Sequence, residues 1–142
     1  MPGELANGAF ESVMDDGAAG DKDAVKRVLA CSGKVCYDLL VEKERRKNRE
    51  TAIVRIEQLY PFPEWAFSNI LGSYARAKEV VWVQEEPLNQ GAWNFVRHRI
   101  ADSLSFGRAV RCLARPESPS TAAGSLRTHR KEQAAIVAAA FE

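Results

Sequence analysis

The sequence predicts an α/β fold: a mainly parallel sheet of about five strands covered by helices on both faces. Apolar runs of strand length alternate four times with segments of helical periodicity, and the connections between them are short. One run, Glu79 to Gln84 (EVVWVQ), is apolar enough to form a central strand that is buried on both faces. This alternation favours parallel strands joined by helices that pack on the sheet.

Residues 1–24 are predicted to be a linker or extended lead-in, and residues 25–142 the α/β domain. Four glycines interrupt the lead-in, which sustains no apolar period. Within it, Ala9 to Asp16 alternates briefly, so it either adds an edge strand or lies across a neighbouring domain. Val25 to Ala30 is the first strand of the domain, and Ser32-Gly33 ends it.

Val35 to Asn48 then has the pattern of a helix. Its second half contains most of the basic run KERRKNR, from Lys43 to Arg49, which is expected to lie in water. Its first half is predicted to bury Val35, Leu39 and Leu40.

The next strand, Thr51 to Leu59, is rich in β-branched residues. Arg55 and Glu57 share one face of this strand, which predicts either an internal ion pair or a contact with a neighbouring domain. Tyr60-Pro61-Phe62-Pro63 makes a turn, because proline cannot continue a central strand, and the last proline suits the first turn of a helix that runs to about Tyr74. The buried side of that helix is predicted from Trp65, Ile70 and Leu71.

The last third of the chain supplies a helix, a strand and a final helix. Gly91 to Leu104 is predicted to be amphipathic, because apolar residues recur four apart at Ala92, Val96, Ile100 and Leu104. Val110 to Ala114 is the fourth strand, Pro116 to Gly124 is a loop, and Thr128 is expected to cap the final helix. That helix is predicted to bury Ala134, Val137, Ala138 and Phe141.

Composition and motifs exclude several classes of protein. With 46% apolar and 27% charged residues and a net charge of +1, the chain shows no clustered basic face of the kind that binds nucleic acid. No apolar run approaches the ~18–20 residues that cross a bilayer, and no signal pattern opens the sequence, so a soluble intracellular protein without membrane partners is expected. GxSxG, HExxH, P-loop and GxGxxG motifs are absent.

The three cysteines, Cys31, Cys36 and Cys112, form no recognisable framework. Their odd number and the absence of CxxC argue against a zinc ribbon and against a disulfide-stapled secreted domain. Cys31 lies in an apolar run and Cys36 follows Val35, so both are interpreted as small buried hydrophobic side chains. A redox role is the alternative.

Two turns are weak candidates for an anion site. Ser32, Gly33 and Lys34 lie between a strand and a helix, where backbone N–H groups attract anions, but a tight turn without a ligand is the favoured interpretation. Arg127 and His129 lie near a helix start, where basic residues oppose the helix dipole, so a solvated polar turn is the favoured interpretation.

Two segments carry a family resemblance: Ile53 to Pro63 (IVRIEQLYPFP) and Val80 to Trp93 (VVWVQEEPLNQGAW). They resemble the C-terminal domain of thiamine-diphosphate-dependent dehydrogenases of the transketolase group, above all the first, decarboxylating component of the 2-oxoglutarate dehydrogenase complex. The resemblance runs from about Val25 to Glu142. Relatives often carry two histidines three apart near His129. The earlier position is Leu126 here, so no histidine pair for a metal or for catalysis is expected, and His98 is expected to be exposed.

The resemblance implies a transketolase C-terminal-like fold and a share in an oxidoreductase of the tricarboxylic acid cycle. That enzyme decarboxylates 2-oxoglutarate on thiamine diphosphate with magnesium and passes the succinyl group to the lipoyl arm of the second component. The Gly-Asp-Gly motif that holds magnesium and diphosphate is absent here, so the chain alone is expected to bind no cofactor or metal and to be inactive. The implied location is the bacterial cytoplasm, or the mitochondrial matrix in a eukaryote.

The implied role of this domain is to contact the remaining domains of the same polypeptide and a second subunit. The residues expected at such an interface follow or end the most apolar strand: Glu85, Glu86, Asn89, Gln90 and Trp93. The competing interpretation is that Asn89 caps a helix and Trp93 is part of the core.

Three other functions stay open from the sequence. A related 2-oxo-acid dehydrogenase, such as one acting on 2-oxoadipate, would carry the same domain. A regulatory module that binds a nucleotide or acyl-CoA would use the two basic turns, and a free-standing α/β protein would use the fold for docking alone.

Overall fold

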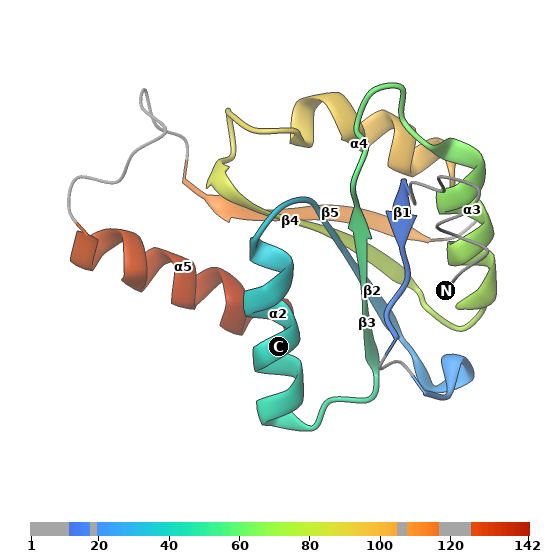
Figure 1. Cartoon of the computed structure of the whole chain (residues 1–142), viewed down its shortest axis with the longest axis horizontal. Coiled ribbons are helices and arrows are strands. Elements are labelled where there is room, and N and C mark those ends of the chain that lie inside the picture. Colours follow the sequence, from blue (N-terminus) through green and yellow to red (C-terminus); the bar gives the residue numbers. More distant parts are fainter. Residues whose placement is uncertain (1–11, 18–19, 105–107, 117–125) are drawn as a thin grey trace, which may run out of the picture.

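The computed structural model describes residues 12–17, 20–104, 108–116 and 126–142, and it confirms an α/β fold built on one five-stranded sheet (Figure 1). The strand order is β1-β3-β2-β4-β5, in which β1 is antiparallel to β3 and the other pairs are parallel. The strands are β1 (Val13–Met14), β2 (Arg27–Cys31), β3 (Thr51–Ile56), β4 (Glu79–Pro87) and β5 (Ala109–Arg115). The helices are the 3₁₀ turn η1 (Lys22–Ala24), α2 (Val35–Arg46), α3 (Glu64–Ser73), α4 (Trp93–Asp102) and α5 (Leu126–Ala140).

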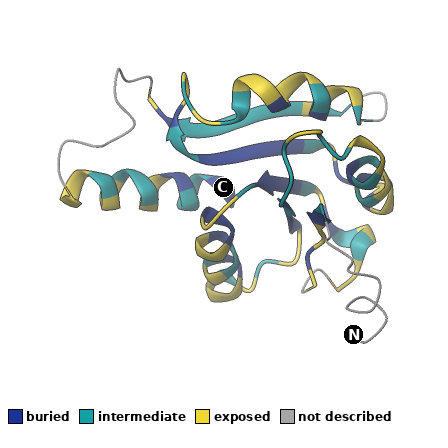
Figure 2. Ribbon diagram, turned by 45° about the horizontal axis from the view of Figure 1, so that its top comes forward, coloured by how far each residue is buried: buried dark blue, intermediate teal, exposed yellow. Residues whose placement is uncertain are grey.

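Alternate residues of each central strand bury against two different pairs of helices, because successive side chains point to opposite faces of a sheet. Figure 2 shows the buried central strands between these helices. Val28 and Ala30 of β2 join the core beneath α3 and α4. Leu29 and Cys31 join the core beneath α2 and α5. The sheet is therefore covered on both faces, as the continuous apolar strands predict.

The sequence places most elements within a few residues of their observed bounds. β4, predicted as the central strand, is an internal strand, while β2 lies at the centre of the sheet. The short alternating segment of the lead-in forms an edge strand, with Val13 opposite Ile56 of β3. Most of the predicted loop at 116–124 lies outside the described residues.

Three predictions about helices are wrong, two of them about buried faces and one about a cap. In α3, Trp65 is 79% exposed and Phe67 is buried instead. Residues two positions apart in a helix lie about 200° apart around its axis, so Trp65 and Phe67 face opposite sides. In α5, Thr128 lies inside the helix rather than at its cap, and Ala134 is exposed. The fully buried positions of α5 are Ile136 and Ala140, one helical turn apart.

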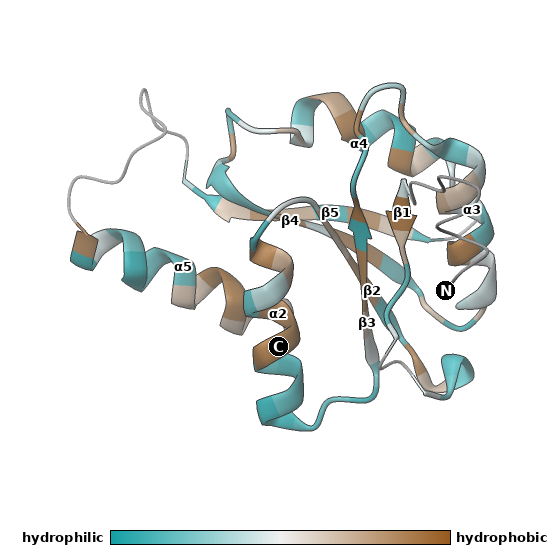
Figure 3. Cartoon of the chain, viewed as in Figure 1, coloured by the Kyte–Doolittle hydropathy of each residue, from teal (hydrophilic) through white to brown (hydrophobic). Residues whose placement is uncertain are grey.

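The second half of α2 is hydrophilic and largely exposed, with one exception that corrects the prediction for Lys43 (Figure 3). The Lys43 ammonium lies 2.7 Å from Asp16 Oδ2, and both side chains are buried, at 7% and 1% exposed. The same carboxylate oxygen accepts a hydrogen bond from the Ile53 backbone N–H at 3.0 Å. This ion pair ties the lead-in to α2 and to β3.

A second charged cluster joins three neighbouring strands at their amino ends. Glu79 of β4 is ion-paired with Arg27 of β2 and, at 3.2 Å, with Arg111 of β5. Burial raises the pKa of Glu79, but hydrogen bonds from Arg111 and Arg27 outweigh it and hold that pKa below its ordinary value. Arg27 also donates to the Ala140 carbonyl at 2.8 Å, which anchors the end of α5.

Within the described ranges, no helix combines the length and the apolar character that a bilayer crossing requires.

Replacing Lys43 by methionine should destabilise the domain by about 3–5 kcal/mol, because the Asp16 carboxylate is left buried without its counter-ion. Lys26→Met is the matched control, since the Lys26–Glu50 pair is 3.4 Å apart and 71% and 64% exposed. That control should change the free energy of unfolding by less than about 1 kcal/mol in urea titrations. Equal losses in both variants would contradict a special role for the buried pair.

Candidate functional site

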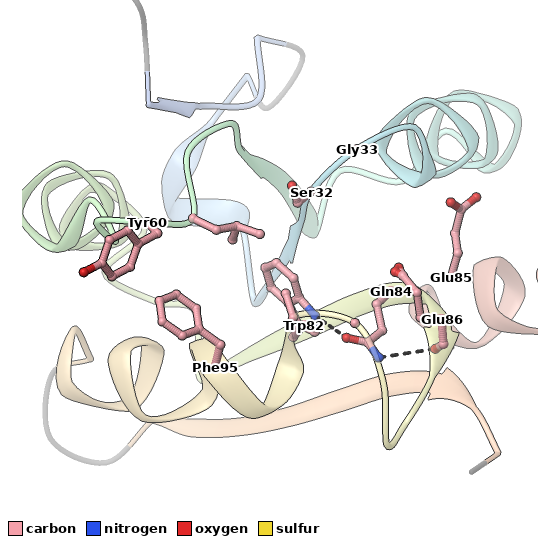
Figure 4. Close-up of a pocket in the computed structure, with 11 residues that line it drawn as sticks. Ser32, Gly33, Tyr60, Trp82, Gln84, Glu85, Glu86 and Phe95 are labelled. Carbon is pink, nitrogen blue, oxygen red and sulfur yellow. Dashed lines mark hydrogen bonds between the residues drawn. The ribbon is translucent and has the colours of Figure 1, made fainter. Parts of the chain in front are cut away.

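A cavity of about 610 Å³ opens at the carboxyl ends of β2 and β4 (Figure 4). From β2 the chain continues to β3 on one side, and from β3 it returns across β2 to β4 on the other. Such a reversal leaves a crevice at the strand ends where ligands and partners collect in open α/β sheets. Its walls come from β2, β4, α4 and the segment after β3: Ser32, Gly33, Leu59, Tyr60, Trp82, Gln84, Glu85, Glu86, Gly91, Ala92 and Phe95.

One wall of the cavity is organised by the buried side chain of Gln84. Its carbonyl oxygen accepts hydrogen bonds from the Trp82 indole N–H at 2.9 Å and from the Trp93 backbone N–H at 3.1 Å. The Trp93 N–H belongs to the first turn of α4, whose N-cap residue, Ala92, offers no side-chain acceptor. Gln84 therefore caps α4 from a neighbouring strand.

The other end of the Gln84 amide holds the loop between β4 and α4. Its nitrogen donates to the carbonyl oxygens of Glu86 at 3.3 Å, Pro87 at 2.9 Å and Gln90 at 2.7 Å. A buried amide with this many partners rigidifies the backbone that it contacts. The loop is thus fixed from within.

Gly91 closes the loop and requires its lack of a side chain. Its φ of 71° lies in the left-handed region that favours glycine. A Cβ at this position would meet both heteroatoms of the Gln84 amide and the Glu86 Cβ at 3.1 Å. Backbone conformation and crowding therefore both select glycine here.

The two adjacent carboxylates at the end of β4 point in different directions, as the alternation of a strand predicts (Figure 4). The Glu85 carboxylate accepts a hydrogen bond from Gln133 of α5 at 3.0 Å. Glu86 extends from the wall beside Gln84. The pair is consequently not arranged as a general acid and base acting on one substrate.

The mouth of the cavity carries exposed aromatic surface. Tyr60 is 80% exposed and Phe95 is 37% exposed, and their ring centroids lie 6.1 Å apart in a tilted arrangement. Leu88, at the tip of the loop, is 38% exposed. An apolar rim next to a fixed loop is typical of surfaces that another protein segment covers.

The predicted interface residues lie together on one segment that borders the cavity. Glu86 and Gln90 are half-buried and Asn89 is exposed, whereas Trp93 is half-buried and packs against the core beneath α3 and α4. The alternative that Asn89 caps the helix is wrong, because Ala92 occupies the N-cap. Sequence reasoning missed Gln84, although an amide that directly follows the apolar run from Val80 to Val83 was a signal for it.

The two predicted anion turns do not meet in one site. Ser32 and Gly33 line the cavity at β2, and Lys34 is an exposed residue that does not line it. His129 lines a separate cavity of about 380 Å³ between α2 and α5. Arg127 is exposed and lines neither of them.

The second cavity is flanked by carboxylates that already have partners. Asp38 accepts from Gln133 at 3.0 Å. Hydrogen bonds from Arg45 and Arg46 lower the pKa of Glu42 to about 2. Among the described residues, no cluster of three or more histidine, cysteine or carboxylate side chains is placed to hold a metal ion.

The remaining charged or titratable residues that the sequence singled out do not form part of either cavity wall. Arg55 and Glu57 form the internal ion pair that their spacing predicts, at 2.7 Å, and Arg55 also donates to the Tyr37 hydroxyl at 3.0 Å. His98 is exposed on α4, as expected.

Comparison with known proteins supports the resemblance. Residues 2–141 match the family described as 2-oxoglutarate dehydrogenase C-terminal. The chain is 45% identical over 138 residues to a protein named 2-oxoglutarate dehydrogenase E1 component from Cupriavidus necator, and 42% identical over 134 residues to one from Haemophilus influenzae. A third, from Azotobacter vinelandii, is 39% identical over 141 residues. These matches cover 97%, 94% and 97% of the chain but only 14%, 14% and 15% of the relatives.

Gln84→Leu should destabilise the domain by about 2–4 kcal/mol, because buried N–H and carbonyl groups lose their partners. It should also speed amide hydrogen exchange at Trp93. Gln58→Leu is the matched control, since Gln58 makes one exposed hydrogen bond, to the Pro61 carbonyl, and it should stay within about 0.5 kcal/mol. Unchanged exchange at Trp93 in Gln84→Leu would contradict the capping role.

The variants Gly91→Ala and Gly33→Ala should distinguish the loss of stability caused by steric crowding from the loss caused by backbone conformation. Gly33 has a φ of 81° with no atom within 4 Å of an added Cβ, so Gly33→Ala should cost about 1–2 kcal/mol. Gly91→Ala should cost more, because its Cβ also displaces the Gln84 amide. Urea unfolding of both variants measures the difference, and a smaller loss at Gly91 would contradict the crowding.

Proposed function

This chain belongs to the 2-oxoglutarate dehydrogenase C-terminal family, and we propose that it is the interface domain of a longer E1 component. The chain spans about one seventh of the length of the relatives it matches, 14% in two of them. The role of the domain is to present a rigid contact surface, at the carboxyl ends of β2 and β4, to the other domains of that polypeptide and to a second subunit.

The observation that carries this proposal is a rigid loop beside an exposed aromatic rim. Gln84 fixes the loop through the carbonyls of Pro87 and Gln90, so the loop backbone loses little further entropy when a partner binds. Tyr60 supplies large apolar area at the rim, of the kind that dominates binding energy at interfaces. A rigid surface of this character fits permanent packing between domains.

The chemistry of the cavity favours protein contact over a phosphorylated ligand. The described residues that line it include Glu85 and Glu86 and no basic side chain. Carboxylates repel a diphosphate, so this cavity does not fit thiamine diphosphate, and we assign that cofactor and its magnesium to other domains. The same repulsion disfavours a nucleotide or acyl-CoA here, so the regulatory alternative is not proposed.

The activity of the whole enzyme is part of the same proposal. The E1 component would decarboxylate 2-oxoglutarate and pass the succinyl group to a lipoyl-bearing succinyltransferase. Thiamine diphosphate would supply the carbanion chemistry when bound in the other domains. The residues of this domain would act on assembly and would touch neither substrate nor cofactor.

Alanine at Glu86, Asn89, Gln90 or Trp93 should weaken subunit association of the full-length enzyme, by roughly tenfold for the aromatic residue, Trp93. Sedimentation across a concentration series measures association, and turnover of 2-oxoglutarate should fall with the dimer fraction. Val41→Ala is the control, because Val41 is 69% exposed on α2, away from the loop.

Unfolding of the same variants in the 142-residue chain separates a lost fold from a lost interface. Normal dimerisation and normal turnover in all four variants would overturn the interface proposal.

A further inference from the structure

The Glu86 side chain brings an uncompensated negative charge to the wall of the cavity. Its root is fixed, because its backbone carbonyl accepts a hydrogen bond from Gln84 and its Cβ packs closely against Gly91. Among the described residues, no hydrogen bond or ion pair reaches its carboxylate. The neighbouring carboxylate differs in this respect, because Glu85 accepts a hydrogen bond from Gln133 at 3.0 Å.

The chain supplies no cation to Glu86 from the surroundings of the cavity. The described residues that line the cavity include no lysine, arginine or histidine. Arg99 lies one turn along α4 from Phe95, and its guanidinium stacks on that ring, with the guanidinium carbon 4.6 Å from the ring centroid. The cation at the rim is therefore held by an aromatic ring and not by the carboxylate.

Covering the cavity with protein would make this charge costly. Glu86 is half-buried in the chain on its own, so water still reaches the residue. A segment that packs on Tyr60 and Phe95 displaces this water, and a carboxylate that is buried without a counter-ion is strongly destabilising. A stable contact at this surface therefore requires a positive charge opposite Glu86.

The aromatic rim suits the remainder of a basic side chain. Figure 4 shows Tyr60 and Phe95 across the cavity from Glu86. The alkyl stem of a lysine or arginine packs along apolar surface while its charged end reaches a carboxylate. Arginine also stacks on aromatic rings and forms two parallel hydrogen bonds with one carboxylate. Arg99 occupies Phe95, which leaves the Tyr60 ring, 80% exposed, for such stacking.

We infer that the cavity receives a basic side chain, arginine or lysine, from the protein segment that covers it, and that Glu86 is the counter-ion of that side chain. The inference rests on the proposed function and adds the chemistry of the partner. The covering segment is thus complementary to this surface in charge as well as in apolar character.

Glu86→Gln tests the charge, because it removes the charge and keeps the shape of the side chain. In the full-length enzyme it should lower the urea concentration that halves turnover, since the partner's cation loses its counter-ion. Where the segment belongs to the second subunit, the dissociation constant of the dimer should rise at least about tenfold.

Glu44→Gln is the matched control for this change. Glu44 is exposed on α2 and does not line the cavity, so neither measurement should move. In the 142-residue chain, both variants should unfold at the wild-type urea concentration, because the described residues give neither carboxylate a partner. A change seen only in the full-length enzyme therefore reports the contact and not the fold.

A photocrosslinker identifies the covering segment. p-Benzoylphenylalanine in place of Tyr60 should capture a peptide of the full-length enzyme that contains arginine or lysine, and mass spectrometry shows which one. Reversing that residue to glutamate should weaken assembly as Glu86→Arg does. The two reversals together should recover at least about tenfold of the lost association, because the ion pair forms again with its charges exchanged.

Two results would overturn the inference: a captured peptide without a basic residue, or a Glu86→Gln enzyme that behaves like Glu44→Gln. If Trp93→Ala still weakens assembly in either case, the proposed interface stands and only the ion pair is wrong. Normal assembly of Trp93→Ala and of the other alanine variants would instead remove the proposed function, and the inference with it.

Discussion

Five hydrogen bonds converge on the side-chain amide of Gln84 at the end of β4, and the geometry of that end of the sheet depends on them. The amide caps α4, fixes the loop that leads to it and holds the Trp82 indole against the cavity. Gly91 is required because any side chain there would enter the space that this amide occupies. The end of the strand, the loop and the start of the helix thus behave as one unit, because a buried polar group stabilises the fold only when all of its hydrogen-bond partners are in place.

The same principle appears elsewhere in the molecule. Asp16 and Lys43 are buried together, and Asp16 accepts hydrogen bonds from both the Lys43 ammonium and the Ile53 backbone N–H. The short edge strand before Asp16 therefore has one position relative to α2 and β3. Glu79 joins the amino ends of three strands through two arginines. Apolar burial on both faces of the sheet supplies the driving force for folding, while these polar contacts fix which elements meet.

The cavity of the proposed interface borders the turn between β2 and α2. Ser32 and Gly33 of that turn form part of its wall. The cavity side faces outward at the strand ends and fits contact with another protein segment.

The sequence by itself determined the class of fold, the order of its elements and the family, because apolar runs, turn residues and the segments 53–63 and 80–93 are local properties of the chain. Periodicity identified helices but misjudged their inward faces at Trp65 and Ala134, since small errors in phase turn a residue toward solvent. Only the tertiary structure decided that Lys43 is buried and that Gln84 caps a helix from a neighbouring strand. Each of these depends on a partner contributed by another element, and such pairing becomes visible only when the strands and helices are brought together.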